Sequence, residues 1–174
     1  MNDIKLFITD IDGVWTDGGM YYDQLGNEWK KFNTYDSAGV IFLKLLNIPL
    51  AIISGEDTEI MKRRAKKLKI EYVFLGVKNK VNTAQELINK LGIAWENVAF
   101  IGDDINDCQL LSKVGLSATP INAPNYIKEK VNWVIPIKGG DGVFRAFVEK
   151  YLIEVNQLNY VLDTYLQNTS KFFQ

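Results

Sequence analysis

The chain has 174 residues, of which 47% are hydrophobic and 12% aromatic, and this apolar content is enough for one domain with a sizeable core. A net charge of −1 and the absence of an apolar run of transmembrane length argue against nucleic-acid partners and against membrane partners. The absence of histidine excludes Ser-His-Asp hydrolases and histidine-ligated zinc, and the single cysteine and an N-terminus unlike a signal peptide predict a cytoplasmic location.

Short apolar runs alternate with stretches of helical spacing along most of the chain. The apolar runs predict strands at residues 4–10, 48–54, 71–76, 97–103, 115–119 and 132–137. The stretches between them predict helices at residues 37–47, 57–69, 79–91, 104–113, 123–130 and 142–152. Nearly continuous apolar strands that alternate with helices are typical of an α/β fold, with a mostly parallel sheet covered on both faces.

Two segments depart from this alternation. Residues 18–33 have aromatic-rich arms around DQLGN and predict a β-hairpin. Near the end of the chain, a terminal helix is predicted by apolar side chains at helical spacing, namely Val155, Leu158, Leu162 and Tyr165. We therefore expect a domain at residues 1–152 and a C-terminal helix and tail at residues 153–174, with the helix docked on its own domain or on a neighbour.

Residues suited to phosphate chemistry stand at or near the ends of the predicted strands. In chain order they are Asp10 and Asp12, Ser54 and Gly55, Lys80 at the start of a helix, and Asp103 and Asp104 with Asp107 behind them. Ligands of open parallel sheets bind beyond the carboxyl ends of the strands, so we expect these side chains at one site. Two carboxylates spaced two apart on a strand point to the same side, where their repulsion needs a cation or a shared proton.

A site for phosphoryl transfer would use each of these groups. Asp10 can attack phosphorus and form an aspartyl-phosphate, while Asp12 can protonate the leaving alcohol and later deprotonate the attacking water. Ser54 and the amides near it can donate hydrogen bonds to phosphate oxygens, and Lys80 supplies a positive charge. A hard cation held by Asp10 and Asp103 would relieve the repulsion, and a site made of oxygen ligands alone favours Mg²⁺.

The same residues carry a family resemblance. DIDGVWTDG, SGE, the lysine of VKNK and GDDINDCQLL resemble the four motifs of the haloacid dehalogenase superfamily of phosphatases. This resemblance implies a Rossmann-like, doubly wound core, a Mg²⁺ cofactor and Asp10 as the nucleophile. It also implies that the main-chain carbonyl of Asp12 is a metal ligand beside Asp10 and Asp103, with Asp104 and Asp107 behind the ligands.

The spacing of the motifs leaves no room for a cap domain. Many relatives insert one between the first and second motifs or between the second and third, but residues 13–53 and 55–79 are too short here. Together with the hairpin, DIDGVWTDGG and GGDGVFR (139–145) resemble the capless branch that dephosphorylates 3-deoxy sugar acids. Members of this branch are tetramers in which a neighbouring subunit completes each site, so the resemblance implies a homotetramer.

The residues after Ser54 bear on the substrate. Octulosonate-type members of the branch commonly have Gly-Arg there, whereas this chain has Gly55-Glu56 and then a basic helix with Arg64 and Lys67. This pattern resembles the phosphatases for 2-keto-3-deoxy-D-glycero-D-galacto-nononate 9-phosphate, which belong to sialic-acid-like synthesis. We therefore expect that substrate, with Glu56, Arg64 and Lys67 as substrate-binding residues. The alternatives are 3-deoxy-D-manno-octulosonate 8-phosphate, from lipopolysaccharide synthesis, and an N-acylneuraminate 9-phosphate.

Other interpretations stay open from the residues themselves. Ser54 also fits a helix N-cap, and GDDINDCQ also fits an acidic helix start. A signalling receiver would use similar groups, although Asp12 would shorten the life of its phosphoaspartate. A non-catalytic assembly domain is the third possibility, although every catalytic position is filled. Finally, Phe172 and Phe173 either reach into a neighbour's site or belong to a frayed terminus.

Overall fold

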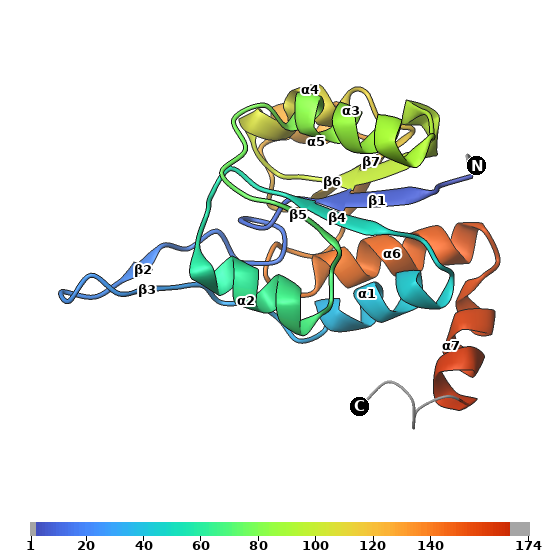
Figure 1. The fold of residues 1–174 in the computed structure, drawn as a ribbon, viewed down its shortest axis with the longest axis horizontal. Helices are drawn as coiled ribbons and strands as arrows, with labels where there is room; N and C mark the ends of the chain where they lie inside the picture. Colours follow the sequence, from blue (N-terminus) through green and yellow to red (C-terminus); the bar gives the residue numbers. More distant parts are fainter. Residues whose placement is uncertain (1–2, 168–174) are drawn as a thin grey trace.

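A computed structural model describes residues 3–167 and has a parallel sheet at its centre (Figure 1). The strand order is β5-β4-β1-β6-β7-β8, and every neighbouring pair is parallel. The strands are β1 (Leu6–Thr9), β4 (Leu50–Ile53), β5 (Tyr72–Phe74), β6 (Val98–Ile101), β7 (Leu116–Pro120) and β8 (Trp133–Ile135). This arrangement confirms the predicted α/β fold with a Rossmann-like sheet.

Helices cover both faces of this sheet (Figure 1). One face carries α3 (Lys80–Leu91), α4 (Cys108–Leu111) and α5 (Asn125–Lys128), and the other carries α1 (Asp36–Leu45), α2 (Glu59–Lys67) and α6 (Val143–Glu154). Successive strand side chains point to opposite faces, so Phe7 packs with α1 and α6 while Ile8 packs with α3. Because both faces are covered, β1, β4 and β6 are buried throughout and, apart from Thr9 at the end of β1, apolar. Each large apolar side chain so buried contributes about 1.5–3 kcal/mol.

Two predicted helices are much shorter than expected. Residues 104–113 begin as a 3₁₀ turn, η2 (Ile105–Asp107), and only then continue as α4. Asp104 caps this turn, because its carboxylate accepts a hydrogen bond from the main-chain N–H of Ile105 at 2.7 Å. The predicted helix at 123–130 is reduced to α5, which begins directly after Pro124. A further 3₁₀ turn, η1 (Trp95–Asn97), precedes β6.

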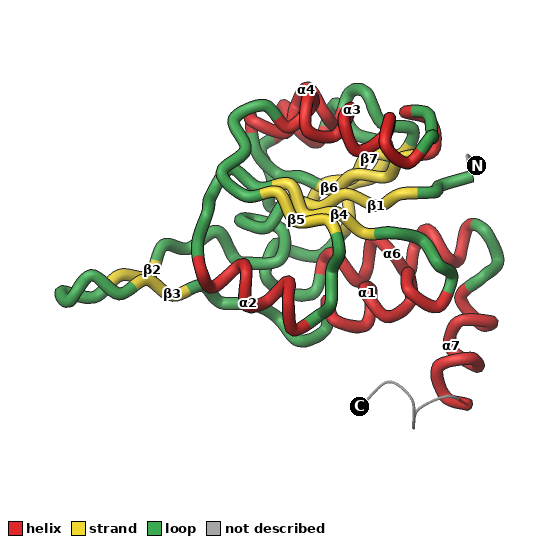
Figure 2. The backbone as a smooth tube through the Cα atoms, viewed as in Figure 1, coloured by secondary structure: helices red, strands yellow, loops and turns green. Residues whose placement is uncertain are grey.

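The predicted hairpin is confirmed and projects beyond the layered body (Figure 2). Its strands β2 (Tyr21–Tyr22) and β3 (Glu28–Trp29) are antiparallel. At the tip, the carboxylate of Asp23 accepts hydrogen bonds from the main-chain N–H groups of Leu25 and Asn27, each at 2.8 Å. Large apolar side chains are exposed along the hairpin, namely Met20, Tyr21, Tyr22, Leu25 and Trp29.

The predicted terminal helix is present as α7 (Leu158–Gln167), which packs against α1 and α6. It begins three residues later than the apolar spacing suggested, because Asn156 has a positive φ of 55° and separates it from α6. Val161 is its buried residue, whereas Leu162, which we expected on the apolar face, is partly exposed. The boundary predicted at residue 152 stays a prediction. Phe172 and Phe173 lie outside the described residues, and within 3–167 no helix is long and apolar enough to cross a bilayer.

Candidate active site

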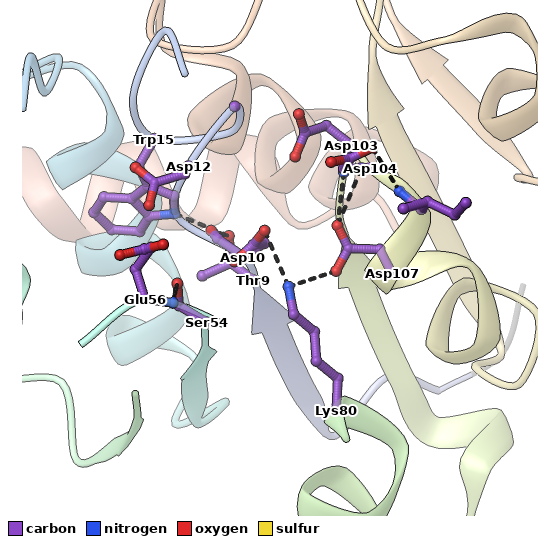
Figure 3. Close-up of polar contacts among 12 residues, drawn as sticks. Thr9, Asp10, Asp12, Trp15, Ser54, Glu56, Lys80, Asp103, Asp104 and Asp107 are labelled. Carbon is purple, nitrogen blue, oxygen red and sulfur yellow. Dashed lines mark hydrogen bonds and ion pairs between the residues drawn. The ribbon is translucent and has the colours of Figure 1, made fainter. Parts of the chain in front are cut away.

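A cavity of about 370 Å³ opens at the carboxyl ends of β1, β4 and β6 (Figure 3). Seven residues that we predicted for the site line it: Asp10, Asp12, Ser54, Gly55, Glu56, Asp103 and Asp104. The remaining lining residues are Gly13, Gly18 and Asn106. The sheet therefore brings three of the four motifs together at one opening, and Lys80 supplies the fourth from beneath Asp10.

Asp10 is held rigidly where β1 leaves the sheet. Its main-chain N–H donates a hydrogen bond to the carbonyl of Ile101 on β6 at 3.0 Å. Behind it, the indole N–H of Trp15 donates to Thr9 Oγ1 at 2.9 Å, and that hydroxyl donates to the carbonyl of Asp10 at 2.7 Å (Figure 3). Only 5% of Asp10 is exposed, so its carboxylate has few positions available.

Lys80 connects two carboxylates inside the protein. Its ammonium Nζ lies 3.0 Å from Asp10 Oδ2 and 2.7 Å from Asp107 Oδ1 (Figure 3). Burial acts to lower the pKa of Lys80, but the charges of Asp10 and Asp107 outweigh it and hold that pKa above its usual value. Lys80 is placed here because it begins α3, directly after Asn79, whose side chain caps the helix. It is therefore a fixed positive charge beside the expected nucleophile.

Asp107 shapes the loop after β6. Its Oδ2 accepts hydrogen bonds from the main-chain N–H groups of Asp103 and Asp104, at 3.0 and 3.3 Å. Gly102 leaves the space that this carboxylate occupies, since a Cβ there would lie 2.5 Å from Asp107 Cγ. With its other oxygen bonded to Lys80, Asp107 has hydrogen-bond partners at both oxygens. Its predicted role behind the metal ligands stays a prediction.

The acidic residues fit a hard metal ion. Oxygens of Asp10, Asp103 and Asp107 all lie within 4.8 Å of one another. Asp10 Oδ1 and Asp103 Oδ1 are buried and have no hydrogen-bond partner in the described structure, which leaves both available to a cation. Gly13 adopts a φ of +80°, and a Cβ at this position would overlap the Asp103 carboxylate.

The pKa values of Asp10 and Asp103 also indicate that the site needs a positive charge. Burial, together with the negative charge of Asp107, raises the pKa of Asp10 to about 7. Burial and the charge of Asp10 raise the pKa of Asp103 to about 8. Both carboxyl groups thus resist ionisation unless a cation compensates them, as a divalent ion between them would.

Known proteins are similar to this chain in sequence and in fold. The sequence pattern of the haloacid dehalogenase-like hydrolases matches residues 63–147. The 3-deoxy-D-manno-octulosonate 8-phosphate phosphatase KdsC of Haemophilus influenzae is 37% identical over 152 residues, which are 87% of this chain and 84% of that protein. This chain belongs to the haloacid dehalogenase-like hydrolases. It lies in their capless, KdsC-like branch and is a phosphatase.

Solved structures of this branch extend the comparison. The Moraxella catarrhalis 3-deoxy-D-manno-octulosonate 8-phosphate phosphatase was solved in complex with magnesium, phosphate and the sugar acid KDO. It is 32% identical, with a TM-score of 0.90 and 94% of each chain covered. The cobalt-bound H. influenzae phosphatase is 36% identical, with a TM-score of 0.85, and the match covers 90% of this chain and 91% of that one. Mg²⁺ is accordingly the cofactor of this hydrolase, and the acidic group described above fits it.

The predicted substrate-binding residues do not converge within one chain of the hydrolase. Glu56 is exposed and lines the cavity. Arg64 instead donates hydrogen bonds to the carbonyl of Asn33 at 3.1 Å and to Ser37 Oγ at 3.0 Å, so it braces the base of the hairpin. Lys67 is exposed on α2 and, like Arg64, does not line the cavity. Their predicted role at the substrate is therefore not supported by the geometry of a single chain.

Ser54 and Gly55 occupy the positions expected of phosphate-binding groups. Ser54 is buried at the end of β4, where its main-chain N–H donates to the carbonyl of Phe74 at 3.0 Å. Its Oγ accepts a hydrogen bond from the N–H of Glu56 at 3.4 Å. Gly55 leaves the cavity wall open, because a Cβ there would meet Asn106 only at 3.7 Å. Their phosphate-binding role stays a prediction.

Two features of the site were missed in the sequence. Lys30 reaches Asp12 from the hairpin, at 2.9 and 2.8 Å from its two oxygens. The sequence signal for Lys30 was a lysine pair in an aromatic-rich arm, which does not reveal which lysine faces inward. GGDGVFR also braces the loop that carries Asp12, because the N–H of Gly140 donates to the carbonyl of Val14 at 2.9 Å.

Proposed function

We propose that this hydrolase removes the phosphate from a phosphorylated 3-deoxy-2-keto sugar acid, and that the substrate is 3-deoxy-D-manno-octulosonate 8-phosphate. The observation that carries this proposal is the match to octulosonate phosphatases over most of both chains, including one solved with magnesium, phosphate and KDO. The expected nononate substrate has no such support among these relatives. The enzyme would then belong to lipopolysaccharide synthesis.

The proposed reaction has two steps. In the first, a carboxylate oxygen of Asp10 attacks phosphorus, the ester P–O bond breaks, and Asp12 gives its proton to the departing alkoxide. In the second, Asp12 takes a proton from a water molecule, which attacks the phosphorus of the aspartyl-phosphate and releases inorganic phosphate and free Asp10. Lys80 balances the charge at Asp10 through its 3.0 Å contact.

The remaining groups hold the phosphate. Asp10, Asp103 and the main-chain carbonyl of Asp12 would hold Mg²⁺, which neutralises charge on the phosphoryl oxygens when bound. Ser54 and the main-chain amides of Gly55 and Glu56 lie beside the same cavity and would donate hydrogen bonds to those oxygens. Asp104 and Asp107 would support the metal ligands through the loop after β6.

One observation favours a second substrate. Glu56 lines the cavity, where its carboxylate can accept hydrogen bonds from sugar hydroxyl groups, and the sequence after Ser54 resembles that of the nononate enzymes. This keeps 2-keto-3-deoxy-D-glycero-D-galacto-nononate 9-phosphate as the second candidate. The N-acylneuraminate 9-phosphate, which carries an N-acyl group at C5 in place of a hydroxyl, is the third candidate.

The deciding experiment compares kcat/KM for the three phosphorylated sugar acids with saturating Mg²⁺. The octulosonate 8-phosphate is expected to give the highest value. A higher value for a nine-carbon acid would replace the proposed substrate and make Glu56 a specificity residue in sialic-acid-like synthesis. If all three were hydrolysed slowly, the phosphatase chemistry would stand and the sugar-acid class would be wrong.

We also propose that the enzyme works as a homotetramer. The cavity has no cap domain above it, and the hairpin beside it exposes five large apolar side chains, which monomeric proteins rarely leave together on their surface. A neighbouring subunit seated on the hairpin would bury these side chains and shield the site from water, as phosphoryl transfer favours.

A further inference from the structure

Lys30 belongs to the hairpin in sequence but to the site in space. Its ammonium donates hydrogen bonds to both carboxylate oxygens of Asp12, at 2.9 and 2.8 Å. Thr16 Oγ1 donates to Asp12 Oδ1 as well, at 3.1 Å. The side chain expected to act as acid and base is therefore held from two directions, by the loop after β1 and by the hairpin.

The pairing is well defined because Lys30 is enclosed by acids. Its side chain is only 2% exposed, and Glu28 Oε1 lies 3.7 Å from its ammonium. A buried ammonium is costly unless it is paired, so this side chain has little freedom to leave. Burial acts to lower the pKa of Lys30, but the hydrogen bond and charge of Asp12 outweigh it and keep that pKa above its usual value.

The backbone fixes the same arrangement. Two residues beyond Lys30, Phe32 forms an isolated antiparallel bridge with Thr16, the residue whose hydroxyl contacts Asp12. One short stretch of paired backbone thus sets the distance between the hairpin arm and the loop of Asp12. Lys31 points elsewhere, since its side chain is 60% exposed and its ammonium reaches only Asp17, at 4.0 Å.

We propose that Lys30 is a positioning residue for Asp12, which aims the carboxyl group of Asp12 at the oxygen that leaves phosphorus. This inference rests on the proposed phosphatase function and adds a part of the hairpin to its machinery. The step concerned breaks the ester P–O bond, forms the bond from Asp10 to phosphorus and moves one proton from Asp12 to the leaving oxygen. A misplacement of about 1 Å in such a group can cost about 10²-fold in rate.

The leaving group provides the test. An alkoxide needs the proton from Asp12, whereas p-nitrophenolate leaves as an anion without one. Replacing Lys30→Met should therefore lower kcat/KM for the sugar-acid phosphate by about 10²-fold and kcat/KM for p-nitrophenyl phosphate by less than about threefold. Lys30→Arg, which keeps a charged donor, should recover at least part of the loss. The matched control Lys31→Met removes the neighbouring charge from the same arm and should change neither value.

A second comparison separates positioning from direct substrate binding. If Lys30 acts through Asp12, then Lys30→Met should cost nothing further in an Asp12→Asn background, whereas losses from an independent contact would multiply. Equal losses on the two substrates, no loss on either, or multiplying losses would each overturn the inference while the phosphatase function stands. A wild-type enzyme that hydrolyses neither substrate would remove the proposed function itself.

Discussion

Asp10, Lys80 and Asp107 form a buried row of charges in which the central ammonium contacts both carboxylates. Replacing Asp10→Asn removes the attacking oxygen but keeps the size of the side chain. We expect kcat to fall by at least about 10³-fold while the far-ultraviolet circular dichroism spectrum stays unchanged, because the main-chain bonds of residue 10 do not involve its carboxylate. Turnover near the wild-type rate would show that Asp10 is not the nucleophile.

The buried acids also predict how stability depends on pH. Without metal, the pKa values of Asp10 and Asp103 are raised from 3.8 to about 7 and about 8. At a pH between the unfolded-state pKa of 3.8 and these raised pKa values, the folded state therefore binds more protons than the unfolded state. The free energy of unfolding then falls as pH rises from about 4 to about 8. Mg²⁺ favours the ionised carboxylates and should oppose this fall.

The measurement is Tm from pH 5 to pH 8, with and without saturating Mg²⁺. We expect a clear decline in Tm without the ion and a much smaller one with it. Burial raises the pKa of Asp36 to about 6. Asp36 should therefore add a decline in Tm at the lower end of this pH range, and Mg²⁺ should not affect that part of the decline. Curves that run parallel at every pH would contradict the assignment of Asp10 and Asp103 as metal ligands.

The presence of a residue at the site was predictable where the residue type and its position after a strand were enough to place it. Asp10, Ser54, Lys80 and Asp103 follow or adjoin strand ends, and parallel pairing brings those ends together whatever the details of packing. The direction of a side chain on a hairpin or a helix depends on tertiary contacts instead. Lys30 was missed and Arg64 was assigned to the substrate for that reason.

At the scale of elements, the loop after β1 depends on a glycine. Gly13 and Gly26 have nearly the same φ, +80° and +81°, but a Cβ at Gly13 overlaps Asp103 while a Cβ at Gly26 meets no atom within 4 Å. Gly26→Ala therefore measures the backbone strain alone, about 1–2 kcal/mol in the free energy of unfolding. Gly13→Ala should cost more than Gly26→Ala and also weaken Mg²⁺ binding in isothermal titration calorimetry. Equal Mg²⁺ affinity in the two variants would argue against this role of Gly13.

The elements themselves were largely predictable, and their ends were not. Each of the six predicted strands is present, because two buried faces require apolar residues along the whole strand. The lengths of α4 and α5 were overestimated, since Asp104 caps a 3₁₀ turn that precedes α4 and Pro124 stands directly before α5. The late start of α7 follows from the positive φ of Asn156, which no periodicity reveals.

At the scale of the whole molecule, the proposed assembly predicts the effect of a charge on the hairpin. Tyr22 is 61% exposed there, and Tyr22→Glu should dissociate the tetramer, because a carboxylate would be buried between subunits. Multi-angle light scattering should then report the mass of one chain, 19.8 kDa, instead of four. The control is Tyr126→Glu on α5, on the opposite layer from α1 and α2, which should leave the mass unchanged. A wild-type protein that is monomeric and fully active would contradict the assembly.

The central position of β1 has a consequence for synthesis on the ribosome. This strand is made first, yet its two neighbours in the sheet are β4 and β6, so one of its edges stays unpaired until Val98–Ile101 have emerged. Such long-range pairing is slow and leaves an apolar strand exposed to aggregation in the nascent chain. Because Asp103 and Asp107 come later still, an unfinished chain that carries Asp10, the proposed nucleophile, lacks part of the proposed metal site, and we expect phosphatase activity only when the sheet is nearly complete.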